Sequence, residues 1–232
     1  MISIIIPTWD EALTIRKTIM ALKEADETKL VDEIIVVDGG SSDETINEVK
    51  VAGAKAIMCP KKGRAAQMNL GASVAENQIL YFLHADTIPP KNFSEDIREA
   101  ISKGFRSGCY RLSFDHDHWF LQASCWFTRF DINAVRFGDQ SLFVTKEVFE
   151  TAGGFREDLL MMEDQEIIGR LKKYGRFIVM PRSVITSARK YLDNGVYRMQ
   201  GIFFRIWIMY YLGYSQQKLL AVHRRLIQGH KL

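Results

Sequence analysis

Two short runs rich in β-branched residues constrain the fold of this chain more than any other feature. They are ISIII at residues 2–6 and EIIVV at residues 33–37, and each ends at turn residues followed by a helical pattern. Strands this apolar are buried on both faces, and a helix between two such strands is typical of a βαβ unit. The chain is therefore expected to build a parallel sheet.

The other elements extend this pattern along the chain. Further strands are expected at residues 55–59, 79–84, 107–114, 141–145 and 177–180. Helices are expected at residues 11–25, 44–51, 64–75, 93–103 and 164–174, with two basic helices after residue 196. We predict an α/β fold in which helices flank a mostly parallel sheet of βαβ units, with a C-terminal helical basic segment. A length of 232 residues, 47% hydrophobic, supports one large core.

Positive charge gathers at the C-terminal end. Residues 189–232 hold eight Lys or Arg and one acid, a net +7, whereas the whole chain carries +3 and the preceding residues therefore −4. This distribution does not favour nucleic acid as a partner. Residues 201–212 of this tail, GIFFRIWIMYYL, are apolar or aromatic except for Arg205. Because apolar residues run nearly all round this helix, we expect burial in the protein or in a homodimer, with peripheral membrane contact through residues 198–228 as the alternative.

Cysteine usage indicates the compartment. Cys59, Cys109 and Cys125 are odd in number and far apart, which favours neither a disulfide framework nor a zinc site. No apolar run reaches the roughly 18 residues of a membrane span, and the N-terminal run is too short for a signal peptide. We expect a cytoplasmic protein, membrane-peripheral if the tail contacts lipid.

Polar residues follow the expected strands, where ligands of parallel sheets bind. Thr8 with Glu11, and Ser41 with Glu44, have capping-box spacing, so helix capping is the simplest interpretation of these loops. A cap does not explain Asp38, which directly follows a buried strand and needs a partner for its carboxylate. A base or ribose that donates hydrogen bonds would be such a partner.

Three further positions carry candidate chemistry. Arg64 follows a glycine at an expected helix start, where phosphate oxygens can bind, and a solvated basic turn is the alternative. Asp86, in the motif His84-Ala85-Asp86, can ligate a hard divalent cation, although a turn former or helix cap is equally typical of the position. Asp164 begins an expected helix, where acids favour the helix dipole or, facing the crevice, can take a proton from a hydroxyl.

Motifs of several other enzyme classes are absent from the sequence. There is no G-x-G-x-x-G after the first strand, no G-x-x-x-x-G-K-[ST], no G-x-S-x-G and no H-E-x-x-H. Dehydrogenases, P-loop enzymes, serine hydrolases and zincins are therefore not favoured.

A set of motifs in a fixed order resembles the family 2 glycosyltransferases, which have the GT-A or nucleotide-diphospho-sugar transferase fold. The matching pieces lie within about residues 1–180 and are ISIIIPTWDE, EIIVVDGGSSDET, GRAAQMNLGA, FLHADT and GGFRE with MMEDQE. FLHADT and FGDQ are most similar to a bacterial group known as selenodomain-associated or arsenosugar-biosynthesis glycosyltransferases.

The resemblance implies a role for each candidate residue. Pro7, Thr8 and Glu11 would line the nucleotide pocket, with Asp38 near the base and Arg64 beside the phosphates. Asp86 would bind Mg²⁺ or Mn²⁺ and Asp164 would be the catalytic base. His84 stands at the first position of the family's D-x-D and is the second candidate metal ligand.

The resemblance also implies a reaction and a division of the chain. We expect an inverting transfer from a nucleotide-diphospho-sugar to a hydroxyl acceptor, and a non-processive one, because the Q-x-x-R-W spacing of processive members is absent. Residues 1–188 would be the catalytic domain, with a nucleotide-binding part at about 1–105 and an acceptor part at about 106–188, and residues 189–232 the basic aromatic tail. A sugar nucleotidyltransferase and a catalytically silent sugar-nucleotide-binding or membrane-associated protein are the alternatives.

The acceptor part contains side chains that could contact a ligand. Core packing is the expected role of the aromatic ones, because large aromatic residues are mostly buried. These candidates are Trp119, Trp126, Phe127, Phe137 and Asp139.

Overall fold

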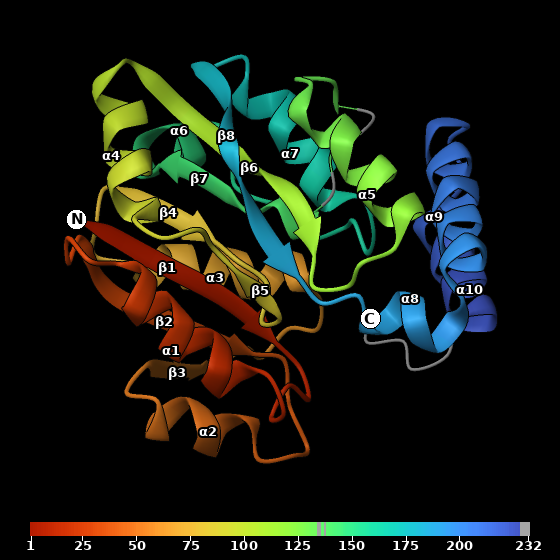
Figure 1. The fold of residues 1–232 in the computed structure, drawn as a ribbon, viewed down its shortest axis with the longest axis horizontal. Coiled ribbons are helices and arrows are strands. Elements are labelled where there is room, and N and C mark those ends of the chain that lie inside the picture. Colours follow the sequence, from red (N-terminus) through yellow and green to blue (C-terminus); the bar gives the residue numbers. More distant parts are fainter. Residues whose placement is uncertain (134–135, 137, 228–232) are drawn as a thin grey trace.

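The computed structural model of the chain describes residues 1–133, 136 and 138–227. Its centre is an eight-stranded sheet in the order β3-β2-β1-β4-β7-β6-β8-β5, with helices on both faces (Figure 1). The strands are β1 (Ile2–Thr8), β2 (Val31–Asp38), β3 (Lys55–Met58), β4 (Ile79–Phe82), β5 (Thr87–Ile88), β6 (Phe105–Phe114), β7 (Leu142–Thr145) and β8 (Arg176–Thr186).

The first half of the sheet is parallel, as the two β-branched runs predict. Strand β1 pairs in parallel with β2 and β4, and β2 pairs in parallel with β3. Successive residues of β1 point to opposite faces, so that Ile4 and Ile6 enter one hydrophobic core and Ile5 enters the other. A strand between two cores has no solvated face, which explains its nearly continuous apolar sequence.

Helices cover both faces of this sheet. On one face lie α1 (Ile15–Ala25), α2 (Thr45–Val51) and α4 (Phe93–Ser102). On the other lie α3 (Arg64–Val74), α6 (Lys146–Thr151) and α7 (Glu163–Leu171).

The second half of the sheet mixes directions. Strand β7 runs antiparallel to both β4 and β6, whereas β8 is parallel to β6 and antiparallel to β5. The two-residue β5 and the short helices α5 (Trp119–Trp126), α6 and α8 (Arg189–Asn194) are elements that the sequence did not predict. Each is shorter than the window of about 11 residues over which helical periodicity is recognised, and β5 is shorter than the roughly four residues of a strand pattern.

Two helices begin later than the capping-box spacing indicates. Helix α1 begins at Ile15 and α2 at Thr45, and neither has a side-chain cap hydrogen bond. Thr8 instead ends β1, and the Ser41 hydroxyl donates to the Asp38 carboxylate. The capping interpretation is therefore wrong, because these side chains hold strand-end loops rather than helix ends.

The C-terminal segment is a helical layer at one end of the sheet, to the right in Figure 1. It consists of α8, α9 (Val196–Tyr211) and α10 (Gln216–Leu226). Helix α9 buries Met199, Ile202 and Ile206 against α10 and against Met161 of the body. None of the helices in the described part of the chain is long and apolar enough to cross a membrane.

The opposite side of α9 is open to solvent in the single chain, so packing within the protein does not bury its apolar residues all round, and burial in a homodimer stays a prediction. Packing within the protein covers one side of the helix only. The exposed apolar and aromatic residues of α9 and of the loop after it are Tyr197, Phe204, Ile208, Tyr211, Leu212 and Tyr214.

Candidate active site

The ends of β1 and β2 place the first candidate residues side by side. Pro7 pairs with Val37 and Thr8 with Asp38 in the parallel register, so both loops leave the same edge of the sheet. Gln67 of α3 ties these ends together, since its amide donates to the carbonyls of Thr8 at 2.7 Å and Val37 at 2.9 Å.

Asp38 is fully buried and has its partners within the protein. One carboxylate oxygen accepts the N–H groups of Gly40 at 2.9 Å and Ser41 at 2.8 Å, and the other accepts the hydroxyls of Ser41 and Thr8. The premise that Asp38 needs an external base or ribose to satisfy its charge is therefore wrong. The carboxylate fixes the shape of the loop that follows β2.

Glu11 lies where three segments meet. Its backbone N–H donates to the hydroxyl of Thr45 at 2.8 Å, and its carboxylate accepts the hydroxyl of Thr14 at 2.8 Å. Arg189 of the C-terminal segment approaches the same carboxylate at 3.7 Å. Residues from both ends of the chain thus border this edge of the sheet.

Arg64 does not lie in a solvated basic turn, because its guanidinium contacts three side chains of the protein. Its Nε donates to a Glu163 oxygen at 2.6 Å, and its other nitrogens lie 3.6 Å from Asp164 and 3.3 Å from Nε2 of His84. Glu163 is buried, and the second of its carboxylate oxygens has no hydrogen-bond partner among the described residues. The Arg64 guanidinium therefore joins α3, the end of β4 and the start of α7.

His84 is held by a carboxylate from a distant segment. Its Nδ1 lies 2.8 Å from Asp139 in the short 3₁₀ turn at Gly138–Gln140. Because arginine only donates, the neutral ring has its proton on Nδ1, toward Asp139, and accepts from Arg64 at Nε2. Burial, the largest influence, and the charge of Arg64 lower the pKa of His84, but the hydrogen bond to Asp139 and the negative charges of Asp139 and Asp164 together raise it above the usual value.

The same pair shifts the pKa of Asp139 in the opposite direction. Burial opposes ionisation, but the hydrogen bond and charge of His84 lower the pKa of Asp139 to about 2. Asp139 is therefore a carboxylate at neutral pH, placed directly beside the position where the family's D-x-D has its first acid.

Asp86 lies on the loop between β4 and β5, mostly covered by protein. Burial, with the negative charge of Asp139, raises its pKa, and His84 and Lys190 partly offset this. No hydrogen-bond donor contacts its carboxylate among the residues that the structure describes. No group of three His, Cys, Asp or Glu side chains suited to a metal occurs within residues 1–133, 136 and 138–227.

Asp164 lies at the start of α7 next to Arg64. Burial and the adjacent charge of Glu163 raise its pKa to about 6, although Arg64 and His84 favour the ionised form. Gly138 approaches it so closely that a Cβ on this glycine would lie 2.1 Å from a carboxylate oxygen of Asp164. His84, Gly138 and Asp164 line one pocket with Met68 and Phe155.

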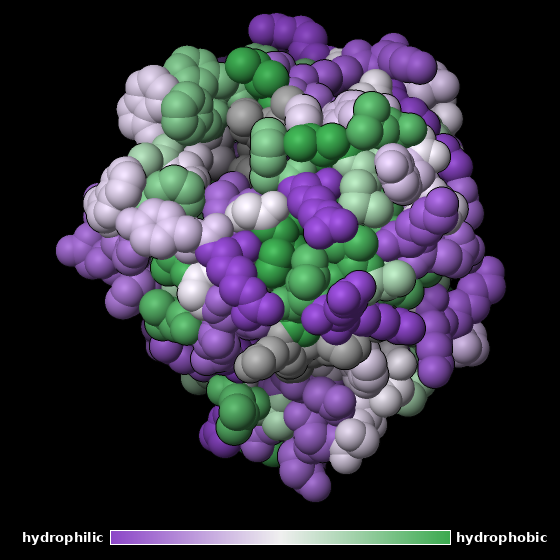
Figure 2. All heavy atoms as spheres, turned by 90° about the vertical axis from the view of Figure 1, so that its right-hand side faces the viewer, coloured by the Kyte–Doolittle hydropathy of each residue, from purple (hydrophilic) through white to green (hydrophobic). Residues whose placement is uncertain are grey.

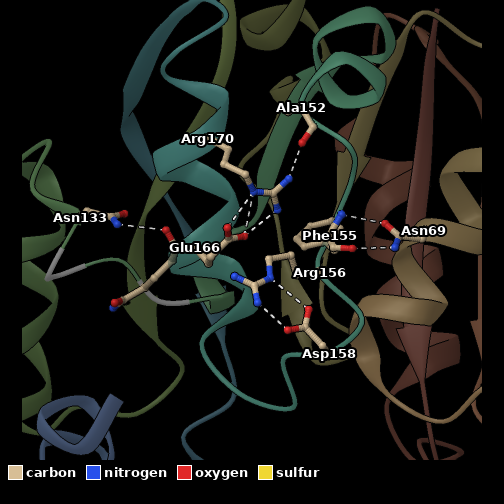
Figure 3. Close-up of polar contacts among 9 residues, drawn as sticks. Asn69, Asn133, Ala152, Phe155, Arg156, Asp158, Glu166 and Arg170 are labelled. Atoms are coloured by element: carbon tan, nitrogen blue, oxygen red, sulfur yellow. Dashed lines mark hydrogen bonds and ion pairs between the residues drawn. The ribbon is translucent and has the colours of Figure 1, made fainter. Parts of the chain in front are cut away.

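The loop between α6 and α7 is fixed by polar contacts that position Asp164 (Figure 3). Asn69 of α3 accepts the N–H of Phe155 and donates to its carbonyl, both at 2.8 Å. Arg170 binds Glu166 one turn earlier in α7 and also donates to the carbonyl of Ala152. The start of α7 is thereby held against α3 and the end of α6.

For several of these residues the sequence did not predict a role in the site. Glu163 was interpreted only as part of an acidic first turn, and Asp139 only as a candidate acceptor contact. Gln67, Asn69 and Lys190 carried no signal, because a single polar residue in a helix is usually solvated.

The aromatic candidates of the acceptor part are largely exposed. Trp119 is 65% exposed, Trp126 47% and Phe127 52%, so core packing does not explain them. Phe137 lies outside the described residues.

Known nucleotide-sugar transferases share this fold. The mannosyltransferase PcManGT from Pyrobaculum calidifontis, solved with GDP-Man and Mn²⁺, aligns with a TM-score of 0.70 and 17% identity over 97% of this chain and 69% of its own. TarS from S. aureus, solved with UDP, aligns with a TM-score of 0.67 and 17% identity over 80% of this chain and 60% of its own. The predicted GT-A fold is confirmed.

The sequence family follows from a direct match. Residues 3–156 match the family model described as Glycosyl transferase family 2, and the chain belongs to this family. An uncharacterised glycosyltransferase of Rickettsia felis is 33% identical over 96 residues, 41% of this chain and 32% of the relative. Glucosyl-3-phosphoglycerate synthase of Mycolicibacterium paratuberculosis is 34% identical over 99 residues, 38% of this chain and 29% of the relative. The chain thus spans about a third of the length of these curated relatives.

Proposed function

We propose that this chain transfers a sugar from a nucleotide-diphospho-sugar to an acceptor hydroxyl, with inversion at the anomeric carbon and without processive elongation. The observation that carries the proposal is the single network in which Arg64 contacts Glu163, Asp164 and His84. It joins a candidate base, a cation for phosphate and the histidine of the D-x-D position at the edge where β1 and β4 end.

Asp164 is the proposed base. It accepts the proton of the acceptor hydroxyl while that oxygen forms a bond to the anomeric carbon. The bond from this carbon to the phosphate oxygen breaks, and the nucleoside diphosphate leaves with the electron pair. One displacement inverts the configuration at the anomeric carbon. The pKa of about 6 leaves Asp164 ionised at neutral pH and makes it a stronger base than an ordinary aspartate.

The donor is assigned to the edge formed by β1 and β2. Pro7, Thr8 and Glu11 would line the nucleotide pocket, and Asp38 would hold the loop near the base. Arg64 and Lys190 are the cations nearest the candidate diphosphate position, because Arg64 contacts Asp164 and Lys190 acts on both Asp86 and Asp139.

A divalent cation fits the residues present. Mg²⁺ and Mn²⁺ are commonly held by one or two carboxylates together with substrate phosphates, so a complete protein cage is not required. The Asp86 carboxylate accepts no hydrogen bond from the described part of the chain, and His84 or Asp139 stands beside it. When bound, such a cation would neutralise charge that develops on the leaving diphosphate.

We also propose that the chain belongs to the selenodomain-associated or arsenosugar-biosynthesis group. The contact between His84 and Asp139 supports this, since it joins the two motifs, FLHADT and FGDQ, on which the finer resemblance rests. Residues 1–188 would form the catalytic domain, with donor binding in about 1–105 and acceptor binding in about 106–188.

Calorimetry and product analysis test the function. We expect UDP or GDP to bind more tightly with Mn²⁺ than without it, and Asp86→Ala to remove that difference. Transfer from the matching sugar nucleotide should give a product of inverted anomeric configuration by NMR. Equal affinity for UDP or GDP with and without Mn²⁺ would contradict the role of Asp86. A product with retained anomeric configuration would contradict the single displacement.

A further inference from the structure

Helix α9 presents a stripe of aromatic and apolar side chains to solvent. Tyr197, Phe204, Ile208 and Tyr211 recur at intervals of three, four or seven residues, which places them on one side of the helix. Phe204 is 60% exposed and Leu212, just beyond the helix end, is 70% exposed. The rings of Phe204 and Trp207 stack at 5.9 Å, and those of Trp207 and Tyr211 lie 4.7 Å apart.

The stripe continues onto the body through α5. Trp119, 65% exposed, lies with its ring 6.4 Å from that of Tyr197, and the ring of Phe120 lies 5.0 Å from Tyr197. The exposed aromatic surface is therefore not confined to one helix end. Isolated apolar residues on a surface are ordinary, but a connected group of this kind marks an interaction site.

Helix α10 lies beside α9 and adds positive charge. Arg198 at the start of α9 donates to the carbonyl of Leu226 at the end of α10, so the two helices run antiparallel. Lys218, Arg224 and Arg225 are exposed on α10, and Arg205 is exposed on α9. Figure 2, which views this side, shows hydrophobic side chains gathered near the middle of the face with strongly hydrophilic ones directly beside them.

Charge decides between the two partners that such a face could take. Helices α9 and α10 together hold five Lys or Arg and no Asp or Glu. A symmetric dimer through this face would set two surfaces of the same positive sign against each other. An anionic lipid surface complements the charge and also accommodates aromatic rings at the level of its headgroups.

We propose that the exposed face of α9 and α10 binds anionic lipid bilayers peripherally, with the aromatic stripe entering the headgroup region and the basic residues contacting lipid phosphates. Residues of this face are distinct from the base and the proposed donor pocket. The inference can therefore fail or hold independently of the proposed transfer reaction.

Vesicle sedimentation tests this proposal with the full chain. Vesicles of phosphatidylcholine alone are compared with vesicles that also contain phosphatidylglycerol, at low and high salt. We expect binding to require the anionic lipid and to fall as salt rises. Phe204→Ser with Leu212→Ser, and separately Arg224→Gln with Arg225→Gln, should each lower partitioning by about tenfold or more.

Matched variants on other faces control for general loss of apolar area or charge. Met20→Ser with Val51→Ser removes exposed apolar side chains from α1 and α2, and Arg98→Gln with Lys103→Gln removes exposed charge from α4 and the residue that follows it. Both should bind vesicles as the wild type does, with all variants retaining the wild-type thermal transition.

Three results would overturn the proposal. The first is that the protein does not bind anionic vesicles at low salt. The second is that the α9 variant and its apolar control lose vesicle binding to the same extent. The third is that light scattering shows a dimer which Phe204→Ser dissociates and which does not bind vesicles.

Discussion

Asp164 is a partly buried carboxylate beside a second acid and one guanidinium, and this setting defines its predicted behaviour. Asp164→Asn keeps the shape of the side chain but removes the proton acceptor. We expect kcat to fall by about 10²- to 10⁴-fold, the usual contribution of a general base, with donor affinity within about threefold of wild type. Turnover and calorimetry measure the two effects, and Asp32→Asn at the far end of β2 is the control. A variant with near wild-type turnover would refute the assignment.

The raised pKa of Asp164 also predicts how stability depends on pH. Folding raises this pKa from 3.8 to about 6, so the folded state holds the proton more tightly than the unfolded state. The stabilisation from that proton is complete below pH 4 and is lost as the pH rises through 6. Asp164→Asn carries no charge, and we expect it to be more stable than wild type by about 2–3 kcal/mol at pH 7.5, at 1.36 kcal/mol per pKa unit.

Urea unfolding at several pH values measures this difference. The advantage of Asp164→Asn should shrink as the pH falls and vanish at about pH 3, below the unfolded-state pKa of 3.8, where the wild-type carboxylate is protonated in both states. In parallel, wild-type kcat/KM should rise through an inflection near pH 6. Equal stability of the two proteins at pH 7.5 would contradict the raised pKa.

Gly138 has a steric role in the same pocket. A Cβ here would lie 2.1 Å from one carboxylate oxygen of Asp164 and 3.1 Å from a ring carbon of His84. Gly138→Ala should therefore displace Asp164 and lower kcat by at least about tenfold, since small misplacements of reacting groups are costly. Gly201→Ala, whose Cβ would meet nothing within 4 Å, is the control in the same assay. Unchanged kcat in Gly138→Ala would show that the pocket relaxes freely.

At the scale of elements, the start of α7 depends on its contacts with α3. Asn69 makes two hydrogen bonds of 2.8 Å to the backbone of Phe155 (Figure 3). Asn69→Ala leaves both backbone groups without this partner and should lower the free energy of unfolding by about 1–3 kcal/mol. We also expect kcat to fall more than donor affinity, because α7 carries Asp164.

Chemical unfolding and steady-state kinetics test the role of Asn69. Ser73→Ala lies in the same helix, where its hydroxyl bonds only to the carbonyl of Leu70, and serves as the control. Equal stability of the two variants would mean that the contact to Phe155 does not hold the loop.

At the scale of the whole molecule, the C-terminal segment takes part in the site. Arg189 of α8 lies 3.7 Å from Glu11, and Lys190 is near enough to lower the pKa of Asp86 and Asp139. Lys190→Gln removes a cation from the candidate diphosphate position. We expect nucleoside diphosphate to bind about three- to tenfold more weakly at low salt, and the difference to shrink at high salt because the exposed charge is screened.

Calorimetry at two salt concentrations measures that effect. Lys103→Gln removes an exposed lysine just after α4, remote from the site, and should leave affinity unchanged. If both variants bind equally well at low salt, the segment contributes no charge to the donor site.

The sequence by itself determined the parallel half of the sheet and the edge at which the candidate residues lie. Strand burial on both faces leaves a local signature in β1 and β2, and the carboxyl ends of parallel strands necessarily share an edge. The order of the family motifs determined the family as well. The placement of Asp86 in a loop after a strand and of Asp164 at the start of a helix follows from the same local patterns.

Only the tertiary structure decided which side chains meet. His84 binds a carboxylate 55 residues away, and Arg64 binds Glu163 across 99 residues. Periodicity reports which side of an element is apolar, whereas these contacts depend on how separate elements pack. For the same reason the sequence could not show which side of α9 is left open: an apolar helix surface is covered or exposed according to the neighbours that reach it, and here α10 and Met161 cover only one side.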